Sequence, residues 1–238
     1  NSTLISSFLG INNKQNLFLV LFFAGLLLSL SFPRLVVRIN SLYSDAIFIQ
    51  MSKEGEVLSG PVNSRVHNDL AYAIDWLDEG AYWHQLNQLK LNGFQLQGLD
   101  GKEVDHVILN THASAVMALS ITPLESNTWY NLALLNAMYA ERYSNAFDAL
   151  KMSVYIDRTS RRLLKRRVLF LWKKFEALDE EMQVVFKSQL LLLWQLKRKD
   201  LIQLVKIYPE IKQWVFELLL NSPDELDLFN ELCVKYKL

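Results

Sequence analysis

The chain has 238 residues, and its 25 Lys and Arg balance 25 Asp and Glu, which argues against a general nucleic-acid binder because such proteins carry a basic excess. Eight Gly and five Pro among many leucines favour an all-α fold built of long helices. A single cysteine, Cys233, excludes an internal disulfide, and we expect it to pack within a C-terminal helix.

The first predicted element is an apolar helix. Residues 17–32 read LFLVLFFAGLLLSLSF and carry no charge. They cover about 24 Å as a helix, and continuation through Val37 approaches the roughly 30 Å of a bilayer core. We therefore predict a tail over 1–15 and a transmembrane helix over 16–37 in a single-pass membrane protein. Its representative anchor residues are Leu17, Phe22, Gly25, Leu28 and Phe32.

Two other interpretations of this segment stay open, a cleaved signal peptide and a buried helix of a soluble core. No small-x-small cleavage site follows the run, since the exit reads Ser-Leu-Ser-Phe-Pro-Arg. The chain begins with Asn rather than Met, from which we expect a processed or incompletely assigned N-terminus. Lys14, Arg34 and Arg38 are too few charges to fix the orientation. The short tail favours a periplasmic domain after the anchor, whereas the basic pair Arg34 and Arg38 favours the opposite orientation, so the side of the membrane stays open.

Helical periodicity continues beyond the predicted span. Ile39, Leu42, Ala46 and Ile49 recur at helical spacing before a break at Ser59-Gly60-Pro61, so 38–61 is assigned to a juxtamembrane helix and linker. The remaining residues, 62–238, form one predicted helical domain. Its expected helices cover 63–79, 81–91, 103–121, 126–140, 144–157, 160–178, 179–197, 199–208, 210–220 and 223–236, with a loop over 92–101. We expect N-caps at Ser126, Ser144 and Ser222, with Pro223 first in its helix.

A pattern of small and bulky residues marks the middle of this domain. Its members are Pro123, Trp129, Leu132, Ala133, Ala146, Leu150 and Ser153. Small residues let paired antiparallel helices approach, while Trp and Leu fill the space between pairs. The pattern resembles a tetratricopeptide repeat over 105–156, although the second helix has its residues one position later than the family's consensus. The resemblance implies a degenerate helical solenoid with a concave binding face, and a generic helical bundle is the alternative.

An anchor followed by such helices also resembles accessory proteins of bacterial polysaccharide export or secretion systems, through residues 123–133 and the helices after them. That resemblance implies a non-catalytic scaffold or adaptor with membrane-protein partners in a hetero-oligomeric envelope complex. A permanent structural subunit of an integral membrane complex is the alternative, since Gly25, Ser29 and Ser31 permit close helix contact. A membrane-tethered enzyme is a third hypothesis.

The sequence predicts no catalytic, cofactor or metal site. His67, His84, His106 and His112 lack the i, i+4 pairing of helix-borne zinc hydrolases. There is neither a Gly-rich phosphate loop nor a nucleophile elbow. The acidic residues within 176–181 stand at a helix junction, where they are expected to complement a helix N-terminus. We therefore expect no enzyme activity and no cofactor.

A basic run follows the repeat-like segment. Eight basic residues occur without an intervening acid: Arg158, Arg161, Arg162, Lys165, Arg166, Arg167, Lys173 and Lys174. An apolar face accompanies them, made of Leu164, Val168, Leu171, Trp172 and Phe175. One interpretation is a solvated helix face. The other is a patch for an acidic protein, anionic lipid or anionic polymer, with Arg158, Arg162, Lys165, Arg166 and Lys173 as candidate contacts.

Two further stretches are strongly apolar, QLLLLWQL over 189–196 and WVFELLL over 214–220. A helix that is apolar on every side has to be buried between layers or against a partner. A central helix of the domain and a partner groove are both compatible with these stretches, and neither reaches the length of a second span.

Overall fold

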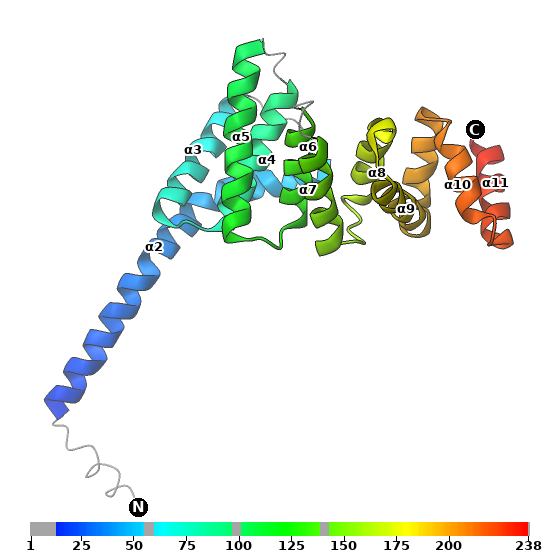
Figure 1. The fold of residues 1–238 in the computed structure, drawn as a ribbon. Coiled ribbons are helices and arrows are strands. Elements are labelled where there is room, and N and C mark those ends of the chain that lie inside the picture. Colours follow the sequence, from blue (N-terminus) through cyan, green and yellow to red (C-terminus); the bar gives the residue numbers. More distant parts are fainter. Residues whose placement is uncertain (1–12, 55–59, 97–100, 139–142, 238) are drawn as a thin grey trace, which may run out of the picture. The chain divides into compact units, whose positions relative to one another are not determined.

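The computed structural model describes residues 13–54, 60–96, 101–138 and 143–237, and every regular element in these ranges is helical (Figure 1). The predicted all-α fold is therefore confirmed. Most of the expected tail (1–12), part of the break at 55–59 and part of the loop at 97–100 lie outside the described residues. The chain divides into two compact units, Asn1–Leu89 and Lys90–Leu238.

The first unit is organised by one long helix. Helix α2 (Asn13–Glu54) runs for 42 residues through Pro33, so the predicted span and juxtamembrane helix are a single element (Figure 1). Helices α3 (Gly60–Trp76) and α4 (Gly80–Leu96) follow it. Because α4 continues to Leu96, the predicted loop over 92–101 is shorter than expected.

The C-terminal half of α2 packs against α3. Val37, Ser41 and Ser44 are fully buried there, and the two small serines let the helices approach closely. Ser44 Oγ donates a hydrogen bond to Asp69 Oδ2 at 3.2 Å. The core of this unit consists of Val37, Phe48, Val66, Leu70, Ala73, Tyr82, Leu86 and Leu89. Residues after the predicted span thus belong to a folded unit.

The second unit is a succession of locally packed helices. They are α5 (Gly101–Ile121), α6 (Ser126–Met138), α7 (Tyr143–Ile156), α8 (Leu164–Lys173), the 3₁₀ turn η2 (Phe175–Ala177), α9 (Glu180–Ile207), α10 (Ile211–Leu219) and α11 (Pro223–Tyr236). α6 packs on both α5 and α7, and α9 packs on α8, α10 and α11. Apart from α9 on α11, these contacts join helices that follow one another in the chain.

Helix α9 lies at the centre of the C-terminal helices. Leu190, Leu193 and Trp194 are buried, which agrees with a central helix for the stretch 189–196. The indole of Trp194 meets the ring of Phe229 edge to face at 5.5 Å. The stretch 214–220 is buried on one side only, since Val215 and Leu219 lie in the core while Phe216 and Leu220 are exposed.

The prediction of one helix over 160–178 is wrong. The amides of Leu163 and Leu164 both donate to Ser160 O in a turn, and α8 ends where Lys174 leaves helical geometry (φ −115°, ψ 18°). The 3₁₀ turn after it places the ring of Phe175 5.0 Å from that of Trp214. Aromatic packing against α10 thus accompanies the break in the helix.

Some of the other predicted helix boundaries agree with the structure and others do not. The separation expected after residue 197 appears as a kink in α9, where Lys197 has φ −148° and ψ 56°. Pro223 stands in the first turn of α11 as predicted. Ser222 stands at the N-cap position of α11 as predicted, although its side chain makes no capping hydrogen bond. Ser126 and Ser144 lie within the first turns of α6 and α7 and do not precede these helices.

Candidate functional site

The predicted basic patch forms one face of α8 and the turn before it. Arg158, Arg162, Arg166 and Lys173 are exposed, and Lys165 is half-buried. A spacing of seven residues places Arg166 and Lys173 on the same side of α8, and Arg162 is exposed in the turn before the helix. The opposite side carries the buried residues Leu164, Val168 and Leu171. We call the five basic residues the α8 basic face.

The charges of the α8 basic face are not neutralised by acids in the described part of the chain. The ion pairs in the described residues have Lys151, Lys197 and Arg198 as their cations. Lys165 Nζ donates to the amide oxygen of Gln203 at 3.0 Å, which fixes its position without cancelling its charge. A concentrated positive field of this kind attracts and orients anionic partners.

Arg167 does not belong to this face, and its inclusion in a surface run is wrong. It is fully buried, and burial lowers its pKa to about 10. Its guanidinium donates from Nη2 to Ser153 O at 2.6 Å and to Ser153 Oγ at 2.9 Å, and from Nη1 to Asp157 O at 2.8 Å. Arg167 is therefore a structural cation that joins α8 to the end of α7.

Ser153 extends this contact to a third helix. Its hydroxyl donates to the carbonyl oxygen of Ser126, at the start of α6, at 2.7 Å. The small residue at position 153 thus allows close packing and also carries a buried hydrogen-bond chain from α8 through α7 to α6. Buried polar groups that are all bonded in this way specify one arrangement of helices.

The repeat-like residues lie together in the α6–α7 pair. Leu132, Ala133, Ala146 and Leu150 are buried where the two helices meet. Trp129 is half-buried, and its indole Nε1 donates to Pro123 O at 2.8 Å. Pro123 itself is exposed.

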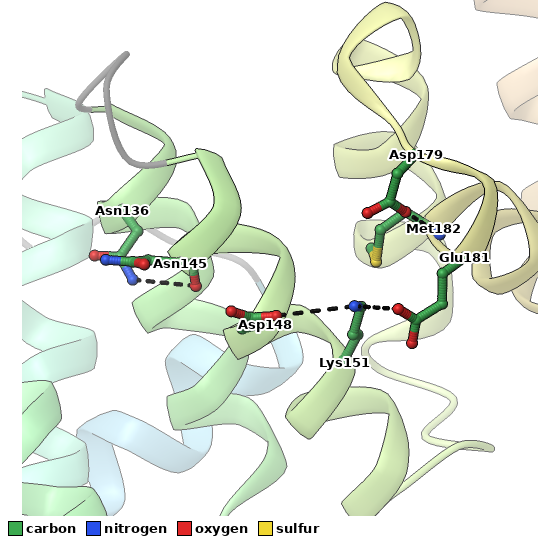
Figure 2. A network of polar contacts seen from close by, with 7 residues as sticks. All are labelled: Asn136, Asn145, Asp148, Lys151, Asp179, Glu181 and Met182. Carbon is green, nitrogen blue, oxygen red and sulfur yellow. Dashed lines mark hydrogen bonds and ion pairs between the residues drawn. The ribbon is translucent and has the colours of Figure 1, made fainter.

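A polar network connects α7 to the start of α9 (Figure 2). Lys151 Nζ lies 2.5 Å from Glu181 Oε2 and 3.8 Å from Asp148 Oδ1. The hydrogen bond to Glu181 is the main cause that raises the pKa of Lys151. Asp179 caps α9 by accepting from Met182 N at 2.8 Å, which confirms the expected acidic complement to this helix N-terminus.

The predicted anchor residues project from α2. Leu17, Phe22, Leu28 and Phe32 are all more than half exposed, and beyond its own helix backbone Gly25 has open space where a side chain would project. Of the helices in the described residues, α2 alone contains a segment, Leu17–Gln50, that is long and apolar enough to cross a membrane. This criterion rests on length and composition, which a signal sequence also satisfies.

Histidines and the cysteine occupy ordinary positions. His106 contacts the Asn110 amide at 2.9 Å, and His112 contacts Asn136 at 3.2 Å. Across the residues that can be described, no group of three or more His, Cys, Asp and Glu side chains is placed to hold a metal ion. Cys233 is buried in α11, as predicted, and burial raises the pKa of its thiol.

Two exposed surfaces distinguish this chain, the apolar segment of α2 and the α8 basic face. The closely packed α6–α7 pair lies beside the second. Comparison with known proteins adds no relative to these features, since no family model, curated protein or solved structure matches the chain.

Proposed function

We propose that this chain is a non-catalytic, membrane-anchored scaffold whose helical domain binds protein partners within a bacterial envelope complex, such as one for polysaccharide export or secretion. The observation that carries the proposal is the continuity of α2. The same helix bears the exposed apolar segment from Leu17 and, from Val37 onward, packs into the core of the first unit. An anchor joined to a folded unit without a linker holds that unit at a fixed height above the bilayer.

The second unit supplies the binding surface in this proposal. The α6–α7 pair resembles one tetratricopeptide repeat, and repeat solenoids of that kind expose a broad face to partners. The α8 basic face follows the pair directly and offers charge that acids in the described residues do not pair. An acidic surface of a partner protein complements it, with anionic lipid or an anionic polymer as the other ligands of matching charge.

A permanent structural subunit is the second candidate, and helix α5 favours it. Leu109, Val116, Met117 and Ile121 are exposed on α5 although all four are large and apolar. Several exposed large apolar side chains on one helix are typical of surfaces that a stable partner covers. A permanent subunit is expected to co-purify with another chain in fixed proportion, whereas a scaffold with reversible contacts separates from its partners in mild detergent.

Crosslinking in native membranes tests the proposal. A photoreactive benzoyl-phenylalanine at the exposed position Arg161, beside the α8 basic face, is irradiated in intact membranes, and its adducts are identified by mass spectrometry. We expect an adduct to a membrane-complex protein and retention of the chain in membranes after alkaline extraction. Release of the chain at alkaline pH, or adducts with lipid alone, contradicts the scaffold.

A further inference from the structure

Helix α2 presents a second apolar face beyond the predicted span. While Val37, Ser41 and Ser44 pack towards α3, the side chains of Leu35, Ile39 and Leu42 are 57%, 59% and 64% exposed. Ala46 is also exposed and continues the same stripe. We call these four residues the α2 seam. The packing of the first unit leaves the seam uncovered although it consists only of apolar residues.

The spacing of the seam is that of a coiled coil. Its residues are separated by four, three and four positions, and Ile49 extends the order by another three. Apolar residues that repeat at alternating three and four positions define a heptad with a mean period of 3.5. Polar residues between them, such as Arg38 and Asn40, lie off the stripe, so the pattern is selective in this part of the helix.

The same register continues backwards into the predicted span. Stepping by the heptad from Leu35 reaches Phe32, Leu28, Gly25, Leu21 and Phe18. Almost every residue there is apolar, so the spacing carries no information in the span by itself. The continued register matters because a helix pair formed along the seam can extend into the bilayer without a change of register. Gly25 falls on the contact line, where a small residue lets two helices approach closely.

Lipid does not cover the whole seam. A bilayer core of roughly 30 Å accommodates about 20 helical residues, whereas α2 has 42. If the span ends near Val37, residues Ile39, Leu42 and Ala46 lie outside the hydrocarbon. Arg34 and Arg38 agree with an exit at this point, because basic side chains reach towards the headgroups. We therefore expect a protein partner, rather than lipid, to cover Ile39, Leu42 and Ala46.

Residue types at the seam favour a second copy of the same helix. In the heptad, Ile39 occupies position a, and Leu35 and Leu42 occupy position d. A β-branched residue at a with Leu at d is the combination that favours parallel two-stranded coiled coils. Copies of a single-pass protein cross the membrane in the same direction, so their α2 helices are parallel and in register. Identical stripes then face each other.

Flanking positions are compatible with this pairing. Arg38 and Asp45 occupy the g positions, and Tyr43 and Gln50 occupy the e positions. Within the unit, Asp45 accepts a hydrogen bond from Gln85 at 3.0 Å and the ring of Tyr43 contacts Arg65. No like charges are brought together across the pair. We propose that two copies of this chain associate through the α2 seam as a parallel coiled coil that continues from the bilayer into the first unit, an inference that rests on the proposed membrane anchoring.

Disulfide trapping in membranes tests the seam. In a Cys233→Ala background, single cysteines are introduced at Leu42 and Ala46 on the seam and at Asn40, which is exposed on another side of α2. Facing a or d positions of a parallel pair come within the roughly 7 Å that a disulfide spans, whereas residues on the outer side do not. We expect a product of twice the monomer mass with Leu42→Cys and Ala46→Cys but not with Asn40→Cys.

Light scattering in mild detergent gives a second measurement on the full chain. Leu42→Lys places two like charges on the contact line and is expected to convert a dimer into a monomer, while the matched variant Asn40→Lys stays dimeric. Leu42 is exposed, so the first unit keeps its fold in both variants.

Several results would overturn the inference. Equal disulfide formation at all three positions, no disulfide at the seam, a crosslinked product of a different mass or an unchanged dimer with Leu42→Lys each contradict a parallel pair. Alkaline extraction of the same membranes separates this failure from that of the proposed function. Release of the chain refutes the anchor, whereas retention without seam disulfides refutes the pair alone.

Discussion

The guanidinium of Arg167 binds Ser153 through two atoms, lying 2.6 Å from its carbonyl oxygen and 2.9 Å from its hydroxyl. A second nitrogen of the same group lies 2.8 Å from Asp157 O. These carbonyls stand at the C-terminal end of α7, where helices have few intrahelical donors and the helix dipole favours a cation. A side chain from α8 thereby caps α7 inside the core.

Replacing Arg167 with Ala is expected to destabilise the second unit. The change removes hydrogen bonds from a charged donor, each worth about 1.5–3 kcal/mol, and leaves Ser153 O short of a donor in the core. We expect a loss of about 3 kcal/mol in the free energy of unfolding, measured by urea titration of the full chain in detergent with circular dichroism.

The neighbouring residue provides the control. Arg166 is exposed, and Arg166→Ala is expected to change the free energy of unfolding by less than about 0.5 kcal/mol. Arg167→Lys keeps the charge but loses the planar fork, so its effect should lie between the two. Equal effects of the Arg166→Ala and Arg167→Ala variants would contradict a structural role for the buried guanidinium.

Arg167 also shows where sequence reasoning failed. A run of basic residues was interpreted as one surface, although helical periodicity turns Arg167 by about 100° from Arg166, towards Leu164 and Leu171. The burial of Arg167 could therefore have been predicted from its position on the helix. The acceptors could not be predicted from the sequence, because Ser153 O and Asp157 O meet the guanidinium only through the tertiary arrangement that brings the end of α7 to α8.

Local patterns predicted other parts of the chain well. The bounds of α11 and the kink after residue 197 follow from Pro223 and from the loss of apolar periodicity near Lys197. The predicted helical continuation beyond the span is confirmed, since α2 runs through Pro33 to Glu54. The burial of Ser41 and Ser44 against α3 depends on contacts distant in sequence, so the division into two units could not be derived from periodicity.

Tyr130 makes stability depend on pH in the alkaline range. Burial raises the pKa of its hydroxyl to about 12 from an ordinary value near 10, against the opposing effect of Arg166 and Arg167. Below pH 10 both folded and unfolded chains hold the proton. Between about pH 10 and 12 the unfolded chain loses the proton first. The free energy of unfolding therefore falls as the pH rises through this range.

The variant Tyr130→Phe should lack that dependence. Two pKa units correspond to about 2–3 kcal/mol, which is the largest difference expected between the two proteins in the free energy of unfolding lost from pH 10 to 12. Absorbance at alkaline pH gives a second measurement, since one of the nine tyrosines should ionise late in the native chain and be missing from the variant's curve. Identical alkaline curves would refute the burial effect.

Two of the acids in Figure 2, Asp179 and Glu181, are expected to contribute different amounts to the stability of the second unit. Asp179 accepts from the amide of Met182 and caps α9, so Asp179→Ala should cost about 1 kcal/mol. Glu181 pairs with Lys151 at the surface, and Glu181→Ala should cost less than that, because exposed ion pairs are worth about 0.2–1 kcal/mol and weaken with salt. Thermal unfolding at low and high salt distinguishes them, and a larger loss for Glu181→Ala would contradict the assignment.

The α8 basic face is expected to hold an anionic partner through its exposed charges. Reversing three of its exposed residues in the variant Arg162→Glu, Arg166→Glu and Lys173→Glu should weaken association with an anionic partner by threefold or more, if each contact contributes about 0.2–1 kcal/mol. Partner association is measured as the yield of the photocrosslink from position 161 in native membranes. The effect should diminish as salt rises, because screening weakens exposed charges over about 10 Å at 0.1 M.

A matched variant separates this face from net charge. Lys199, Lys206 and Lys235 are exposed outside the α8 basic face, and reversing all three to Glu changes the total charge by the same amount. If only the first variant loses the crosslink, position matters and the face binds. If both lose it equally, the field of the whole unit is responsible. If neither does, the basic side chains of α8 are a solvated surface, because a partner held by those charges cannot tolerate their reversal.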